Sequence, residues 1–352
     1  IPALGMTALL SACNMQDKKA EGPDTVGSSQ KIYAKGSFGY DREFLRAMQD
    51  DLVILGKDST GPQVLVSPDY QGRVMTSTAE GDGGTSFGWI NYDLIASGKT
   101  VEHINPVGGE ERFWLGPEGG QYSLYFKKGS PFIFDHWFVP KELDTEPFKL
   151  VSSNEKEANF EKEMQLENYS GNLLSLKVNR TIRLLDKQAI GNALGIELPQ
   201  EVSYVGFESE NIVTNTGKEA WTKKTGLLSI WVLSMLNASE GTTVAIPFNK
   251  QGSGSVVTDD YFGKVPADRL KVGDGLILFK ADAAHRSKIG ISPRRALPLA
   301  ASYDAVKSVL TLAQFSLPAG ESEYVNSLWK LQDDPYSGDA VNVGRMLVQL
   351  RQ

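Results

Sequence analysis

Apolar and polar side chains alternate most regularly between residues 173 and 185. Leu174, Leu176, Val178, Ile182 and Leu184 recur at alternate positions, and most of the residues between them are polar. Successive side chains of a β-strand point to opposite sides, so a period of two predicts a strand that buries one face and exposes the other. Strands are therefore the main expectation for this chain.

Short apolar runs of the same kind occur along most of the sequence, separated by turns rich in Gly, Pro and Asn. The 35 glycines favour many turns between short strands over a helical protein. The pattern predicts an all-β fold, a large antiparallel sandwich or barrel. The predicted strands are Leu52–Leu55, Gln63–Ser67, Gly72–Ser77, Tyr122–Phe126, Phe160–Glu167, Leu173–Leu185, Glu201–Phe207, Asn211–Thr214, Leu227–Met235, Thr242–Phe248, Gly275–Lys280, Lys288–Ile291 and Ser308–Phe315.

Helix signals are few and short. Asp41–Gln49 has helical spacing of its apolar residues, with Asp41 as the expected N-cap, and Lys187–Leu194 is a weaker candidate. No repeat of fixed period and no linker-like segment interrupts the later sequence. We therefore expect one domain over residues 36–352.

The first residues predict export and lipid attachment. Leu10-Ser11-Ala12-Cys13 resembles a bacterial lipoprotein box, in which a signal peptidase cuts before the cysteine and the thiol carries lipid. Residues 1–13 are therefore interpreted as the remnant of a signal segment and residues 14–35, which are polar, as a flexible tether. The alternative is a chance cysteine in a leader. The expected location is the bacterial cell envelope, with a membrane contact through the lipid only.

Charge and motifs exclude several classes of function. The net charge of -7 and the absence of a long Lys/Arg cluster argue against a nucleic-acid partner. Phosphate-loop, HExxH, CxxC and dinucleotide-binding motifs are missing, and His103, His136 and His285 are isolated from one another. We expect neither a metal ion nor a cofactor.

Candidate chemistry is concentrated in residues 103–137. This stretch combines two histidines, two tryptophans, Arg112 and acidic residues with six glycines, a set that suits a ligand with hydroxyl groups and C–H faces, such as a sugar. The alternatives are a rigid surface loop with ordinary ion pairs, tryptophans that anchor the core, and a hydrogen-bonded structural His136. The predicted catalytic residues are Glu110, Glu111 and His136, and the predicted substrate-binding residues in the stretch are His103, Arg112, Trp114 and Glu118.

Two further arginines occur within predicted strands. Arg73 follows Gly72, and Arg180 stands where the alternation of its strand calls for another apolar residue. A buried arginine destabilises a fold unless it is paired. Both are predicted to contact the ligand, with a buried structural ion pair as the alternative.

Several motifs carry a family resemblance over roughly residues 36–340. With QGR at 71–73, GGEERFW from 108 and NTG at 215–217, the chain resembles the galactose mutarotase-like (aldose 1-epimerase) superfamily. It resembles more closely an uncharacterised branch of bacterial lipoproteins that contains YQGRVMTSTA, SFGWIN and YVNSLW. The resemblance implies a large antiparallel supersandwich whose concave face binds carbohydrate, a His acid and a Glu base in the catalytic members, and cleft arginines at Arg73 and Arg112.

Two departures from the catalytic pattern affect the expected function. The strand that should carry the catalytic histidine reads LLSIWVLSML, with Ser229 and Trp231 in that region, and the chain ends in VNVGRMLVQLRQ, before the late strand that should carry the base. A truncated or altered C-terminus is therefore an open possibility. A general acid and a general base each typically raise the reaction rate by about 10² to 10⁴-fold. The loss of both groups therefore favours a binding function over catalytic turnover.

The leading hypothesis is a carbohydrate-binding, mutarotase-like lipoprotein of the cell envelope. The second is an aldose epimerase or glycan-cleaving enzyme that uses other Glu and His residues. The third is a structural lipoprotein without catalytic activity.

Overall fold

The computed structural model describes residues 32–261, 263–282, 284–318, 323–344 and 347–351, the last range through its backbone alone. Cys13 and the predicted signal segment lie outside the described residues. Tyr33 and the residues that follow form one compact unit, and the Tyr33 hydroxyl donates a hydrogen bond of 2.7 Å to Asp82.

The described part of the chain is the predicted all-β fold with few short helices. Every strand pairing among these residues is antiparallel. The strands are β1 (Val53–Leu55), β2 (Gln63–Ser67), β3 (Arg73–Thr78), β4 (Arg112–Gly116), β5 (Lys149–Ser153), β6 (Glu157–Glu167), β7 (Leu173–Leu185), β8 (Gly206–Asn215), β9 (Ser229–Met235), β10 (Thr242–Pro247), β11 (Leu270–Val272), β12 (Leu276–Lys280), β13 (Lys288–Ile291), β14 (Leu299–Asp304), β15 (Val309–Gln314), β16 (Val341–Gly344) and β17 (Leu347–Arg351). The helices are α1 (Phe38–Arg46), α2 (Tyr92–Ser97), α3 (Lys141–Asp144) and α4 (Lys187–Leu194), with short 3₁₀ turns η1 (Gly81–Gly83) and η2 (Phe134–His136).

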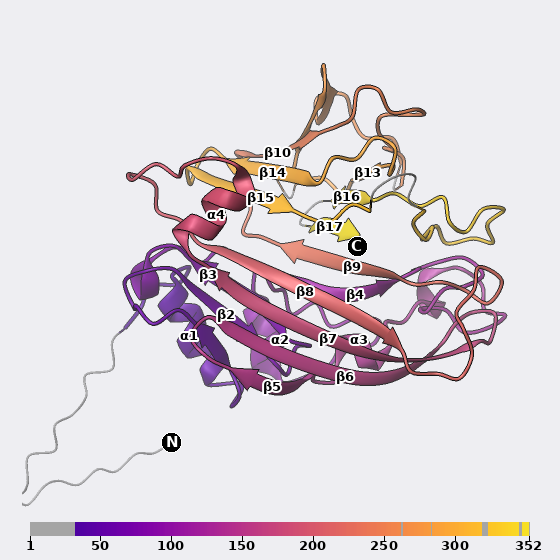
Figure 1. Cartoon of the computed structure of the whole chain (residues 1–352), viewed down its shortest axis with the longest axis horizontal. Helices are drawn as coiled ribbons and strands as arrows, with labels where there is room; N and C mark the ends of the chain where they lie inside the picture. Colours follow the sequence, from indigo (N-terminus) through magenta and orange to yellow (C-terminus); the bar gives the residue numbers. More distant parts are fainter. Residues whose placement is uncertain (1–31, 262, 283, 319–322, 345–346, 352) are drawn as a thin grey trace, which may run out of the picture. The chain divides into compact units, whose positions relative to one another are not determined.

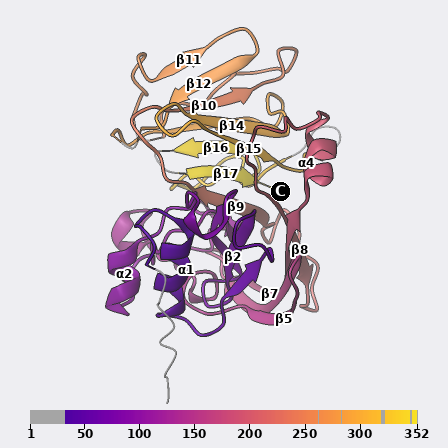
Figure 2. The same ribbon diagram turned by 90° about the vertical axis from the view of Figure 1, so that its left-hand side faces the viewer.

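The strands form four sheets, arranged largely in layers. Their orders are β1-β2-β3, β5-β6-β7-β8, β13-β16-β17-β9-β4 and β11-β12-β10-β14-β15. The sheet that contains β4 and β9 lies between the β5–β8 sheet and the β10–β15 sheet (Figures 1 and 2). Each side of this middle sheet faces a separate hydrophobic core, because Trp231 belongs to one cluster and its neighbour Val232 to the other.

Alternation in β7 produces the predicted two-sided strand. Leu174, Leu176, Val178, Arg180 and Ile182 are buried, whereas the odd-numbered positions between them are partly exposed. The strand has the predicted bounds of Leu173–Leu185, and α4 has the predicted bounds of Lys187–Leu194.

Three of the local predictions were wrong. α1 begins earlier than expected, because the Ser37 hydroxyl accepts from the backbone N–H of Tyr40 and caps the helix, while Asp41 lies buried inside the first turn. Residues 122–126 form no named strand, since their backbone turns back on itself through bonds such as Leu124 N–H to Pro117 O. Of the predicted strand at 201–207, only the last two residues belong to a strand, β8.

Candidate functional site

β4 places the central part of the 103–137 stretch inside the protein. All five residues of this strand are buried, and its register with β9 sets Trp114 opposite Trp231. Since side chains alternate along a strand, Arg112 and Trp114 share one face. The Arg112 guanidinium lies over the Trp114 ring, 4.6 Å from its centroid.

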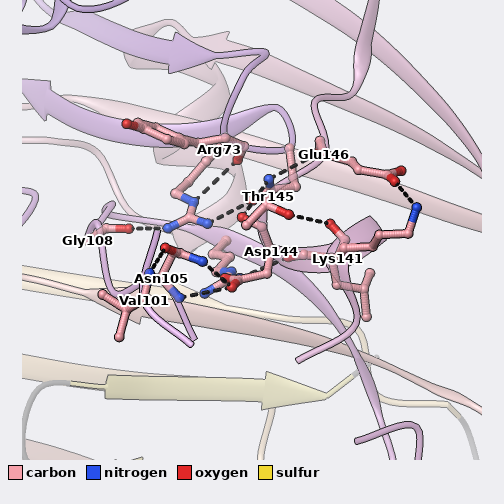
Figure 3. Close-up of polar contacts among 12 residues, drawn as sticks. Arg73, Val101, Asn105, Gly108, Lys141, Asp144, Thr145 and Glu146 are labelled. Atoms are coloured by element: carbon pink, nitrogen blue, oxygen red, sulfur yellow. Dashed lines mark hydrogen bonds and ion pairs between the residues drawn. The ribbon is translucent and has the colours of Figure 1, made fainter. Parts of the chain in front are cut away.

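Arg112 is held by an ion pair with Asp144 at the end of α3. Its Nη2 donates to Asp144 Oδ1 and to the Leu143 carbonyl, both at 2.8 Å. The other carboxylate oxygen of Asp144 accepts from the backbone and side-chain nitrogens of Asn105, at 2.9 and 2.7 Å (Figure 3). Burial lowers the pKa of Arg112, and Asp144 acts in the opposite direction. No local motif marks Asp144 or Asn105 in the sequence, because only the tertiary fold brings them to Arg112.

Arg73 is fully buried and is bound by neutral oxygen atoms. Its three nitrogens donate to the Gly108 carbonyl at 2.6 Å, to Gln71 Oε1 at 2.8 Å and to the Tyr70 carbonyl at 3.3 Å (Figure 3). Burial, followed by the nearby charge of Arg112, lowers the pKa of Arg73 well below its usual value. Gly109 allows this approach, because a Cβ there would lie 2.4 Å from Arg73 Cδ.

Arg180 forms a buried ion pair with Glu111. Its Nη1 lies 3.3 Å from Glu111 Oε1, and its Nη2 contacts the other carboxylate oxygen. The same guanidinium donates to the Gly72 carbonyl at 2.9 Å and to Asn211 Oδ1 at 2.6 Å, while Ser209 donates to Glu111 at 3.0 Å. Arg180 therefore forms a buried ion pair, which was the alternative to a contact with the ligand.

Glu110 is a buried carboxyl group that is hydrogen-bonded by Ser77. Ser77 Oγ donates to Glu110 Oε1 at 2.8 Å, and Oε2 has no partner among the described residues. Desolvation by burial raises the pKa of Glu110 to about 7, which the bond from Ser77 only partly offsets.

The two histidines of the stretch lie in different surroundings from these carboxylates. His136 is exposed on η2 and forms no hydrogen bond or ion pair with Glu110 or Glu111. His103 is half-buried, with its Nδ1 2.7 Å from the Trp137 carbonyl and its ring stacked on Phe138. His136 is therefore exposed, whereas Glu110 and Glu111 are buried.

A continuous aromatic row extends from the face of β4 that carries Trp114. Successive ring centroids are 5.6 Å apart from Trp231 to Trp114, 5.4 Å to Tyr125, 5.9 Å to Trp137 and 5.8 Å to Trp329. We call these five residues the aromatic row. Tyr125 was predicted only as part of a strand. The aromatic row joins segments that lie far apart in the sequence, from Trp114 to Trp329, so no sequence pattern could have defined the row.

Polar groups accompany the aromatic row. The indole N–H groups of Trp114 and Trp137 and the Nε–H of Arg112 are buried, and none has a hydrogen-bond partner among the described residues. Trp329 Nε1 donates to Glu118 Oε1 at 3.2 Å. The row therefore combines flat aromatic rings, four of them buried in one hydrophobic core, with three donors and a carboxylate.

Two cavities of the described structure lie away from the aromatic row. One, of about 50 Å³, is bordered by residues that include Ser86, Asn237 and Lys307, and the other is an open groove that runs from Asp50 to Glu155. Neither is lined by a predicted site residue. Among the described residues, no group of three or more His, Cys, Asp or Glu side chains could hold a metal ion, and no helix is long and apolar enough to cross a membrane.

Comparison with known families places residues 36–344 in a family of unknown function (DUF6786). The chain belongs to this family. No curated protein matches it at a significant level.

Three of the solved structures that the chain is similar to are the following. A galactose mutarotase-like protein from Lactobacillus casei ATCC 334 is 9% identical, with a TM-score of 0.44 over 86% of this chain and 87% of that chain. A protein from Synechocystis sp. PCC 6803 is 12% identical, with a TM-score of 0.49 over 86% of both chains. A putative aldose 1-epimerase from Escherichia coli K12 is 11% identical, with a TM-score of 0.41 over 74% of this chain and 77% of that chain. Similarities this weak carry no ligand or activity to this chain.

Proposed function

We propose that this protein binds carbohydrate at the aromatic row, with Arg112 and Glu118 as its charged partners. The observation that carries the proposal is the presence of buried donors on Trp114, Trp137 and Arg112 that have no partner among the described residues. Buried polar groups are nearly always hydrogen-bonded, so three such donors beside stacked rings favour a ligand that supplies oxygen atoms and apolar C–H faces. A sugar supplies both.

Binding is better supported than turnover. Glu111, one of the two carboxylates predicted for catalysis, is already bound by Arg180 and Ser209. Glu110 has the raised pKa of a general acid, but acid–base catalysis on a sugar also needs a second group on the other side of the reacting atoms. His136, the expected second group, is exposed on η2, whereas Glu110 is buried.

We also propose attachment to the cell envelope through Cys13. The support is the sequence Leu10-Ser11-Ala12-Cys13, which lies outside the described residues. Metabolic labelling with a palmitate analogue in a bacterial host should label the protein, and C13S should abolish the label. Equal labelling of both forms would contradict attachment at this residue.

A glycan array followed by calorimetry tests the binding proposal. The wild-type chain should bind neutral mono- or oligosaccharides with dissociation constants in the millimolar range or tighter. W137F keeps an aromatic ring and removes one unpartnered N–H, so it should weaken binding roughly tenfold, the value of one hydrogen bond in a dry site.

Trp89 provides a matched control, because it is half-buried and lies outside the aromatic row. W89F should leave the sugar affinity unchanged. The proposal is wrong if no sugar binds at millimolar concentration, or if W89F and W137F weaken binding to the same extent.

A further inference from the structure

The sheet of β10, β11, β12, β14 and β15 buries one side and exposes the other (Figure 2, upper part). Ile246 and Phe279 point into a hydrophobic core and are fully buried. Residues at the alternate positions point the opposite way, since successive side chains of a strand alternate. There, five large apolar residues have exposed fractions between 38% and 61%: Leu276, Leu278, Tyr303, Leu310 and Leu312. We call this side of the sheet the apolar face.

The strand register makes the apolar face continuous across four strands. Leu278 on β12 lies opposite Ala245 on β10. Ala245 lies opposite Ala301 on β14, and Ala301 lies opposite Leu312 on β15. Residues that lie opposite each other in neighbouring strands have their side chains on the same side and close together. The exposed leucines therefore belong to one connected apolar surface.

The outer side of the β5–β8 sheet shows the residues that a water-facing side carries in this protein. Lys149 and Lys177 both pair there with Glu161, at 2.9 and 2.8 Å, and Asn179 and Thr181 follow Lys177 along β7. An antiparallel sheet with one solvated side alternates apolar and polar residues in this way. The apolar face lacks that polar cover, although it is exposed in the same degree. A connected apolar surface of this kind indicates a contact with another apolar surface.

The charged residues that point to the apolar side are both cationic. Lys271 on β11 lies opposite Leu278, and Lys280 occupies the next outward position after Leu278 along β12. Lys280 also contacts Asp282 at 3.3 Å, but that carboxylate is already bound to Arg269. Among the outward-pointing residues of the five strands as the structure describes them, none is acidic. The face therefore complements an anionic partner.

The apolar face is small for an interface between two copies of the chain. With strands about 4.8 Å apart and a rise of about 3.4 Å per residue, the outward positions of β12, β10, β14 and β15 cover about 400 Å². One partner of a stable dimer buries about 800 Å². Two such faces in contact would also bring the lysines of both copies into one interface. A lipid surface requires no matching area and supplies the anionic groups.

We propose that the apolar face rests on the surface of a membrane that contains anionic lipid. The leucines and Tyr303 enter the boundary between headgroups and acyl chains, while Lys271 and Lys280 contact lipid phosphates. The proposal goes beyond carbohydrate binding and adds to the predicted lipid attachment at Cys13, on which it does not depend. The contact fixes which side of the protein faces the membrane.

Sedimentation with lipid vesicles tests the proposal on the full-length C13S chain, which carries no lipid at residue 13. Vesicles of phosphatidylcholine with about one third phosphatidylglycerol should bind roughly tenfold more tightly than phosphatidylcholine alone, and about 0.5 M salt should remove most of this difference. L310S/L312S should weaken binding to both kinds of vesicle roughly tenfold. K271Q/K280Q should weaken binding roughly tenfold for the anionic vesicles only.

Matched variants place the same changes outside the apolar face. Val151 and Ile212 are exposed to 53% and 51%, so V151S/I212S removes a similar amount of exposed apolar surface. K99Q/K218Q removes two exposed lysines. Both variants should bind vesicles like the C13S chain. The amino-terminal residues are the same in every variant, so their own contribution to binding cancels in the comparison.

Two kinds of result would overturn the proposal. One is equal weakening by the variants on the apolar face and by their matched controls. The other is a dimer in light scattering without vesicles that L310S/L312S dissociates, because the face would then bind a second copy. Far-ultraviolet circular dichroism checks that L310S/L312S is folded, and K271Q/K280Q, which changes only exposed side chains, tests the same face if it is not.

Discussion

Glu111 and Arg180 form a buried ion pair that joins the approach to β4 with the centre of β7. The side-chain exposures are 7% for Glu111 and 0% for Arg180, so water screens neither charge effectively. Such a pair contributes little net stability relative to apolar residues, but removal of one partner leaves a buried charge without a counter-ion.

The first prediction concerns this pair. E111Q leaves the Arg180 charge unpaired and should lower the free energy of unfolding by roughly 3 to 5 kcal/mol, measured by urea denaturation. R180M combined with E111L removes both charges and should recover much of the loss.

The more exposed pair of Arg183 on β7 and Glu210 on β8 is the control, because Arg183 lies on the same strand as Arg180. E210Q should lower the free energy of unfolding by less than about 1 kcal/mol, because solvent screens this pair. Equal losses for E111Q and E210Q would contradict the role assigned to burial.

The second prediction concerns the pH dependence of stability. The pKa of Glu110 is raised to about 7 from its ordinary 4.5, so the folded protein holds the proton more tightly than the unfolded chain. The stabilising effect of this proton is fully present below about pH 4.5 and is lost as the pH rises to about 7. From the size of the shift, the loss is on the order of 3 kcal/mol.

Urea denaturation at pH values from 4 to 8 measures this dependence. E110Q should remove the decline in unfolding free energy between about pH 4.5 and 7, because an amide does not titrate there. E163Q, which changes an exposed carboxylate on β6, should leave the decline in place. A decline that persists in E110Q would assign the dependence to other groups.

The third prediction concerns Gly109. Its φ of 111° is a backbone conformation that favours glycine, and an added Cβ would meet Arg73 Cδ at 2.4 Å. G109A should therefore lower the free energy of unfolding through both backbone strain and displacement of Arg73, by more than about 2 kcal/mol in total, measured by urea denaturation.

Gly129 separates the two effects, because its φ is 77° and a Cβ there would meet nothing within 4 Å. G129A should show the loss from backbone strain alone, about 1 kcal/mol. Similar losses for both variants would mean that the contact with Arg73 contributes nothing.

The sequence by itself determined the class of fold. The alternation of Leu174, Leu176 and Val178 predicted β7 correctly because burial of one face repeats every two residues along a strand, which is a local property. β4 was not predicted, since all of its residues are buried and no alternation marks it. The sequence also indicated that Arg180 would need a partner, but did not indicate which one.

Only the tertiary structure decided what the polar residues contact. Adjacent residues such as Glu110, Glu111 and Arg112 have three different partners, Ser77, Arg180 and Asp144, because successive side chains of an extended chain point in different directions toward different elements. The aromatic row depends in the same way on long-range packing, which brings Trp329 onto Trp137 and Trp231 onto Trp114. Residue types along the chain therefore limit the chemistry that is available, while the packing of distant segments fixes which groups meet.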